Sequence, residues 1–232
     1  MALLVNSGRA GLAAALKARP MAYAWGRGAS WWGQTEVETK IFAGAPERIT
    51  LDHAPIASLI VKDVGSAQTY VDGKDFTFDS NTGIITRVNG GAIHPGATVE
   101  TQAVFGTPQM GSSEVALVDE VGRRSAASVE FVVPDPDGAI YTPGGSRWTI
   151  SIEATRYLYV SVLFDFLEAA DETIREVGIF VDGTRKAGVP EGQLYLTPDQ
   201  VDSPGYLMLL DRFAGKTRSP SERQGFSYVL VI

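Results

Sequence analysis

The sequence contains no cysteine and only two histidines among its 232 residues. The absence of cysteine excludes disulfide bonds, thiolate nucleophiles and zinc sites built from cysteine. His53 and His94 both stand close to a proline, and neither belongs to a Ser/His/Asp pattern or to a metal-ligand spacing. We therefore interpret both histidines as loop residues, and we predict no catalytic residue, no cofactor and no metal site.

Loops that bind phosphate or calcium are also lacking. Gly26-Arg27-Gly28 begins like a dinucleotide-binding loop, but Trp31 occupies the place of the third glycine. Leu210 stands where a phosphate-binding loop ending at Lys216-Thr217 needs its first glycine. The Asp135–Gly138 turn lacks the later ligands and the closing glutamate of a calcium loop. These absences predict a protein that is not an enzyme.

Basic residues are fewer than acidic residues: the sequence has 20 Lys and Arg and 27 Asp and Glu, which gives a net charge of −7. A nucleic-acid-binding protein needs a basic face that displaces counterions from phosphates, so we expect no nucleic-acid partner.

The apolar stretch from Ala2 to Val5 is broken by Asn6 and is far shorter than a membrane-spanning helix. We therefore expect neither a signal peptide nor a membrane span.

Glycine and proline are abundant, at 25 and 12 residues, which favours many turns over long helices. We predict a mainly β fold with one short N-terminal helix, a minor α component. That helix is expected to be capped by Ser7, to run to Ala18 and to end at Pro20. A strand follows from Met21, in which Met21, Tyr23 and Trp25 share one face.

Residues 35–107 are predicted to form an inserted β-sandwich-like module, and residues 1–34 with 108–232 a second domain. Within the insert, Asp72-Gly73 and Asn81-Thr82-Gly83 are hairpin-turn signals. Its expected strands are Ile49–Asp52, Ser58–Asp63, Gln68–Val71, Phe76–Asp79, Ile84–Arg87 and Thr98–Phe105. Further strands are expected at Ser125–Val133, Arg147–Glu153, Tyr157–Phe166, Glu176–Val181, Gln193–Leu196, Tyr206–Asp211 and Gln224–Ile232, while 116–123 is predicted to be a helical turn or an extended arm.

Two groups of residues are candidates for contacts with other chains. Three of the four tryptophans, Trp25, Trp31 and Trp32, lie close together in a glycine-rich stretch, which fits a core wedge, a protein contact or a sugar contact. Arg123, Arg124 and Arg175 fit either solvated faces or ion pairs between subunits. The six residues together form our candidate interface. In the predicted strand around Arg175, apolar and polar residues do not alternate regularly, because the charged Glu176 would share a face with the apolar Ile174. We therefore expect a β-bulge near Gly178.

Outside the insert, the sequence resembles the N-terminal, baseplate-attaching domain of phage tail-collar fibre proteins. The resemblance rests on segments that occur in the same order, namely Val5–Ala15, Ala22–Gly28, Leu117–Arg124, Tyr159–Phe166, Thr173–Gly183 and the closing strand Phe226–Ile232. The insert, from Thr69 to Val99, resembles a β module found in phage tail and virion proteins. The resembled family usually carries a long fibre after this domain, whereas the sequence here ends at Ile232, so we expect a stand-alone baseplate or adaptor piece rather than a complete fibre.

The resemblance implies a structural part of a tailed-phage virion, assembled in the host cytoplasm and located in the baseplate region of the tail. Its partners would be other baseplate, tail or fibre proteins and further copies of itself, as a trimer or a multiple of three. An alternative is a receptor-binding adhesin that recognises a host glycan through the insert or the Trp-rich loop. A cell-wall hydrolase is a more distant alternative.

Overall fold

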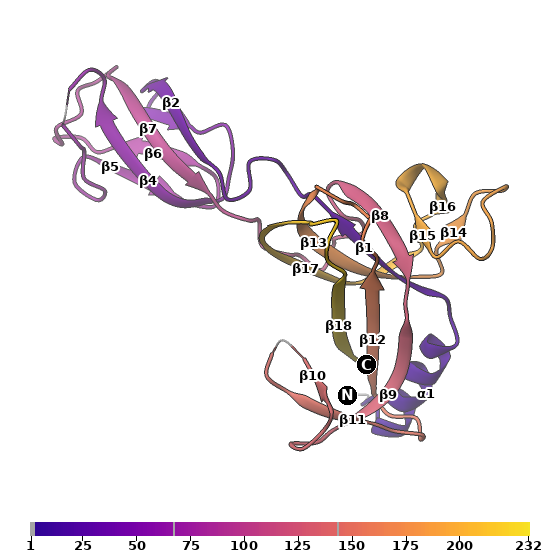
Figure 1. Ribbon diagram of the computed structural model, residues 1–232. Helices are drawn as coiled ribbons and strands as arrows, with labels where there is room; N and C mark the ends of the chain where they lie inside the picture. The colour runs from indigo at the N-terminus through magenta and orange to yellow at the C-terminus, as the bar shows by residue number, and fades with distance from the viewer. Residues whose placement is uncertain (1–2, 67, 143) are drawn as a thin grey trace. The chain divides into compact units, whose positions relative to one another are not determined.

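The computed structural model describes residues 3–66, 68–142 and 144–232 and divides the chain into two compact units (Figure 1). Unit 1 comprises the chain up to Gly28 together with Gly111–Ile232, and unit 2 comprises Ala29–Met110. These boundaries lie within six residues of the predicted insert, 35–107. Ala2, the first residue of the N-terminal apolar stretch, lies outside the described ranges.

Unit 1 begins with the predicted short helix, α1 (Asn6–Lys17). Its N-cap is Val5, which has extended backbone angles and no capping side chain, so the prediction of a Ser7 cap is wrong. Ser7 lies inside the first helical turn, where its hydroxyl cannot act as an N-cap acceptor. The helix is fixed to the β structure by an ion pair of 2.8 Å between Lys17 and Glu130 and by Arg9 Nη1, which donates to Ile232 O at 2.7 Å.

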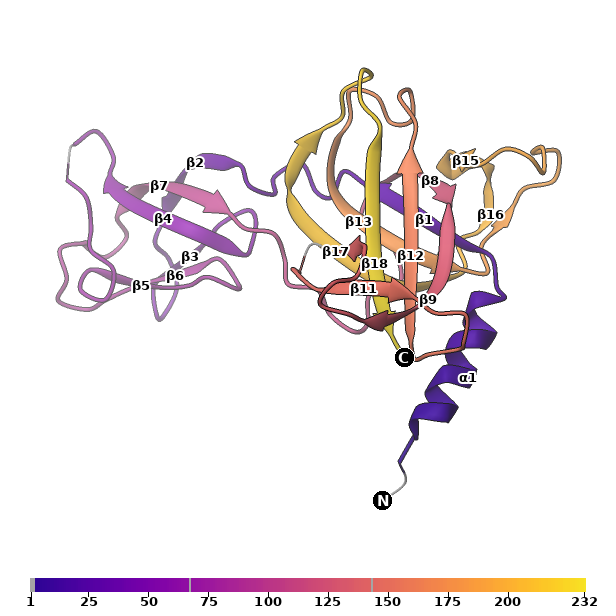
Figure 2. The ribbon, with the colours of Figure 1, turned by 60° about the horizontal axis from the view of Figure 1, so that its bottom comes forward.

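The rest of unit 1 is dominated by two five-stranded antiparallel sheets (Figure 2). The first sheet has the order β15-β8-β1-β13-β17, formed by Tyr195–Leu196, Glu120–Ser125, Met21–Gly26, Thr173–Val181 and Tyr206–Thr217. The second has the order β10-β11-β9-β12-β18, formed by Ile140–Tyr141, Arg147–Ile150, Ser128–Pro134, Tyr157–Phe164 and Gln224–Val231. A small ribbon pairs β14 (Thr184–Arg185) with β16 (Val201–Ser203), which follows the 3-10 turn Pro198–Gln200.

The main core of unit 1 lies between these two sheets. Met21, Tyr23 and Trp25 point into it from β1, which confirms that they share one face. Opposite them, alternate residues of β12 from Leu158 to Phe164 are 3% exposed or less. At roughly 1.5–3 kcal/mol for each large apolar side chain, burial of this cluster is the main stabilising contribution in unit 1.

Strand β13 is buried on both faces, which explains its irregular sequence alternation. Val177 and Ile179 face the main core, whereas Phe180 packs with Ala24 and Leu117 in a smaller cluster on the other side of the sheet. Glu176 belongs to that second side and is completely buried. A β-bulge was expected near Gly178. The β13–β17 pairing shifts register between Ile179 and Phe180 and again between Ile174 and Glu176, and at both places the additional residues lie on β17 rather than on β13.

Unit 2 contains two three-stranded antiparallel sheets, β2-β7-β4 and β3-β6-β5. Their strands are Thr35–Ile41, Thr98–Phe105, Ile56–Asp63, Arg48–Thr50, Ile84–Arg87 and Phe76–Asp79. The bounds of β5, β6 and β7 agree with the prediction. Strand β2 was not predicted from the sequence, and the predicted strand Gln68–Val71 contributes only an isolated bridge between Lys62 and Thr69. The unit has its own core, centred on Phe42, Val61, Ile85 and Phe105.

The mainly β fold with one short N-terminal helix is therefore confirmed. The described part of the chain contains no helix that is long and apolar enough to cross a membrane.

Candidate assembly interface

Trp25 lies in the core of unit 1 and has no exposed surface. Its ring stacks on Phe164 with a centroid distance of 3.5 Å, and the Arg218 guanidinium lies 5.2 Å from the Trp25 ring. Its indole Nε1 donates to the Tyr195 hydroxyl at 3.3 Å. Burial raises the pKa of Tyr195 above its usual range. Trp25 is therefore a core residue of unit 1.

Trp31 and Trp32 belong to unit 2, whereas Trp25 belongs to unit 1, so the three tryptophans do not share one core. Trp32 is only 3% exposed. Trp31 is half-buried, and its ring stacks on His53 at 4.9 Å and meets the edge of Phe105 at 6.0 Å. Of the three, Trp31 alone offers a substantial surface to a partner.

Arg123 points to the outer side of the first sheet and is 3% exposed. Its guanidinium lies 4.6 Å from the Phe180 ring, forms a bidentate ion pair with Glu120 at 2.8 Å and donates to Pro204 O at 2.8 Å. A buried guanidinium that is satisfied in this way holds the sheet to the Ser203–Gly205 turn. Arg123 therefore acts within unit 1 in this conformation.

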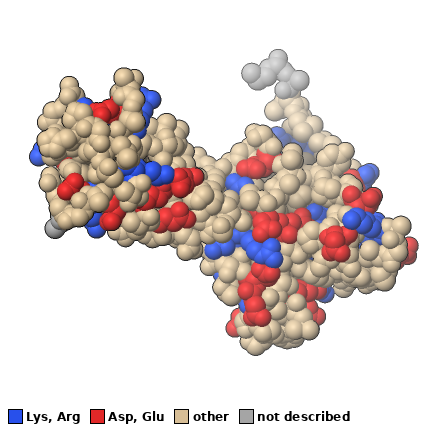
Figure 3. All heavy atoms as spheres, turned by 90° about the horizontal axis from the view of Figure 1, so that it is seen from above, with Lys and Arg blue, Asp and Glu red and all other residues tan. Residues whose placement is uncertain are grey.

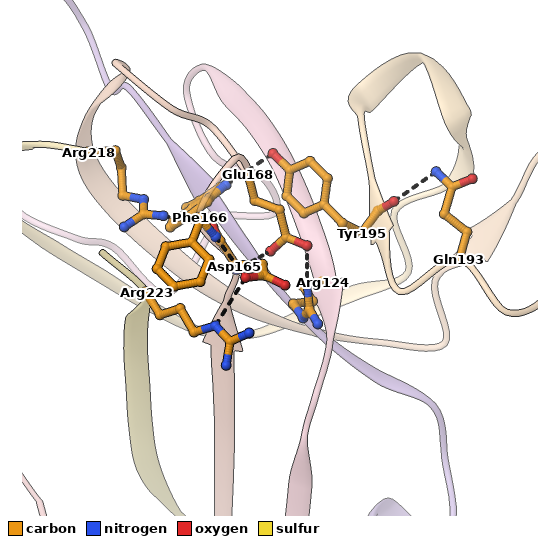
Figure 4. Close-up of polar contacts among 9 residues, drawn as sticks. Arg124, Asp165, Phe166, Glu168, Gln193, Tyr195, Arg218 and Arg223 are labelled. Carbon is orange, nitrogen blue, oxygen red and sulfur yellow. Dashed lines mark hydrogen bonds and ion pairs between the residues drawn. The ribbon is translucent and has the colours of Figure 1, made fainter. Parts of the chain in front are cut away.

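Arg124 participates in a polar cluster at the end of β12 (Figure 4). Arg124 from β8 and Glu168 from the loop after β12 point toward one another and form an ion pair. In the same loop, Asp165 accepts the Phe166 N–H at 2.9 Å and pairs with Arg223 at 3.1 Å. The Phe166 N–H and the Arg223 guanidinium together lower the pKa of Asp165. Phe166 is 41% exposed and lies under the Arg223 guanidinium.

Arg175 donates to Arg27 O at 3.1 Å, next to a second ion-pair cluster. Arg27 pairs with Glu172 at 2.6 Å and with Asp119 at 3.0 Å, across three separate segments of unit 1. The Arg27 guanidinium lowers the pKa of Glu172, and both carboxylates raise the pKa of Arg27. Arg175 and Arg124 thus lie in or beside polar clusters at the surface, where partly exposed ion pairs contribute little stability individually.

Sequence reasoning missed several exposed apolar side chains that are stronger candidates for contacts than the buried tryptophans. Ile152 is 96% exposed, and Leu167 is 81% exposed next to Phe166. Leu3, Leu4 and Val5, which precede α1, and Leu12 on the helix are also exposed. Their exposure depends on which face of each element the tertiary structure covers, and a pattern of apolar residues does not supply that information.

The surface charge shows no continuous basic patch on the face drawn in Figure 3, where the larger groups of Lys and Arg lie beside acidic residues. Among the described residues, no group of three or more His, Asp or Glu side chains is placed to hold a metal ion. The surface features of unit 1 that fit contacts with other proteins are therefore its exposed apolar residues and its sheet edges.

Comparison with known protein families identifies the class of protein. The sequence profile of the family described as baseplate wedge 3 tail fiber network component matches residues 96–232, more than half of the chain. The chain belongs to this family. The match begins two residues before β7 of unit 2 and includes the whole Gly111–Ile232 part of unit 1. The baseplate wedge 3 assignment supports the resemblance to phage tail-fibre proteins at the level of a phage baseplate and tail-fibre family.

A second comparison also leads to a phage tail. The tail sheath protein of Burkholderia phage BcepMu is 32% identical over 93 residues, which make up 40% of this chain and 19% of that protein. The chain thus spans about a fifth of the length of this relative. Together the two comparisons make this baseplate wedge 3 family member a structural component of a bacteriophage virion, with a location in the tail.

Proposed function

We propose that this protein is an attachment component of the baseplate, which joins tail-fibre proteins to the tail by protein–protein assembly. The role is that implied by the resemblance to the baseplate-attaching domain of tail-collar fibre proteins. Its functional form is a closed oligomer, a trimer or a multiple of three, assembled in the host cytoplasm. The family match and the similarity to a tail sheath protein support a role within the tail.

The observation that carries this proposal is the outer edge of β18 in unit 1. This strand pairs with β12 along its whole length, and no other described strand pairs with it. Its sequence, Gln224–Val231, contains no charged residue and no proline, which are the usual means of protecting an exposed edge from other chains. Proteins that function as monomers rarely leave such an edge open, so its exposure favours assembly as the function.

The proposal is tested with a phage whose gene for this protein carries a nonsense codon, grown in a host that does not suppress it. We expect DNA-filled capsids with tails or baseplates that lack fibres, and complementation with the intact gene restores them. Particles with complete tails and fibres that fail only to adsorb would instead support the glycan-binding adhesin. Clearing of a cell-wall suspension by the purified protein would support the hydrolase.

A further inference from the structure

Beside the free edge of β18, a pocket of about 310 Å³ opens between the edge strands of the two sheets of unit 1. Its apolar wall is formed by Trp25, Phe213, Phe226 and Tyr228, and its charged residues include Lys216 and Arg218. Ligand sites in proteins combine an apolar wall with a few polar groups in this way. The pocket is distinct from the Arg124–Glu168 pair and from the Arg27 cluster.

The positive charges of the pocket have no counterion among the described residues. Arg218 is 4% exposed, and it donates to the backbone oxygens of Glu222 and Asp165, each at 2.9 Å. Its buried Nε has no hydrogen-bond partner among the described residues. Lys216 is exposed and contacts the neutral side chain of Gln224 at 2.7 Å. A buried cation without a neighbouring anion is costly, and an anionic ligand removes that cost.

The one carboxylate in the pocket wall, Asp211, does not neutralise these charges. It accepts a hydrogen bond of 2.7 Å from the Tyr228 hydroxyl, and no ion pair joins it to a cation among the described residues. The pocket thus carries two cations and one carboxylate that is already hydrogen-bonded. This composition fits a ligand that presents one carboxylate and one apolar group.

We infer that a neighbouring tail protein of different sequence adds an extended segment to the β18 edge, with an acidic side chain opposite Lys216 and Arg218 and an apolar side chain in the pocket. An added strand satisfies the outward N–H and C=O groups of β18, while the pocket supplies the selectivity. This inference rests on the proposed function and specifies the chemistry of the partner.

A second copy of this chain fits the edge less well. Its own open-edged strand with alternating acidic and apolar residues is β2, which contains Glu36 and Glu38. Glu38 already pairs with Lys40 at 2.6 Å and accepts the Asp52 N–H, and Glu36 faces His53. The acidic groups of β2 are therefore engaged within unit 2, which favours a partner of another sequence.

The test is a carbodiimide cross-link in intact virions, because this reagent joins an amine to a carboxylate in direct contact. Mass spectrometry then identifies the peptide joined to Lys216. We expect an Asp or Glu of another tail protein, and we expect no such product at Lys186, an exposed lysine outside the pocket. A product with a second copy, a product within the chain, or an unmodified Lys216 overturns the inference. If other lysines of the chain still join to tail proteins, the proposed attachment function stands.

Two variants provide an independent measurement. Lys216→Gln is expected to lower retention of the protein in salt-washed tails by about tenfold, the effect of losing one charge-assisted contact. Lys186→Gln is the matched control and retains normal levels. Normal retention of folded Lys216→Gln, with folding judged by thermal unfolding, contradicts the inference.

Discussion

Replacement of Glu176 by alanine tests how the Gly111–Asp119 segment is held on the first sheet. The Glu176 carboxylate is completely buried, and it accepts N–H groups of Val118 at 2.7 Å and Asp119 at 3.3 Å. It also faces the buried guanidinium of Arg212, whose Nε lies 3.5 Å from Oε2. Loss of one partner from a buried ion pair costs about 3–5 kcal/mol, mainly because the other charge stays buried.

The expected cost lies near the lower end of that range, because Arg212 also pairs with Glu114 at 3.2 Å. We predict that Glu176→Ala lowers the free energy of unfolding of unit 1 by about 3 kcal/mol. Glu176→Gln keeps an acceptor for the Val118 N–H but loses the charge, so its cost is expected to be about half as large.

The assay is chemical denaturation of the full chain, with hydrogen exchange at the amides of Val118 and Asp119. In the alanine variant these two amides exchange faster, while unit 2 unfolds at an unchanged denaturant concentration. A loss below about 1 kcal/mol, or unchanged exchange at both amides, refutes the assignment of Glu176 as the anchor of the segment.

Three further results are expected. Ile179→Asp buries a carboxylate in the main core and is expected to destabilise unit 1 by at least about 4 kcal/mol. Arg175→Ala is expected to keep near-normal thermal unfolding and to weaken assembly. Equal destabilisation by the two substitutions contradicts this ranking. An excised 29–110 fragment unfolds cooperatively in a thermal scan, and a broad, non-cooperative change rules out an independent unit 2. Because Arg27 lowers the pKa of Glu172, their pairing stabilises the fold fully above the ordinary glutamate pKa of 4.5 and less as the pH falls below it. In Arg27→Gln the free energy of unfolding is therefore expected to decrease less as the pH is lowered below 4.5 than it does in the unmodified protein.

The sequence was most informative where turn residues bracket β-branched or aromatic residues. The Asn81-Thr82-Gly83 turn fixes the hairpin of β5 and β6, so both strands could be predicted to the residue. Strand β2 could not be predicted in this way, because the edge position lets Glu36, Glu38 and Lys40 alternate with exposed Val37 and Ile41. A polar, half-exposed strand of this kind resembles a loop in sequence.

The candidate interface shows the limit of sequence reasoning more clearly. Trp25 and Trp31 are six positions apart, but they enter different cores, because the chain passes from unit 1 to unit 2 between them. Arg123 and Arg124 are adjacent, yet they point to opposite sides of β8, toward Phe180 and toward Glu168. The β17–β18 pocket joins residues from Trp25 to Tyr228 and carries no local sequence signal. Only the tertiary structure shows such sites.

The most direct test of the central claim is the position and symmetry of this protein in a cryo-electron microscopy reconstruction of the intact virion. We predict that unit 1 lies in the baseplate region of the tail, in three copies or a multiple of three, with density for a strand of a neighbouring protein along the outer edge of β18. A single unpaired copy, or a location inside the capsid, would contradict the account.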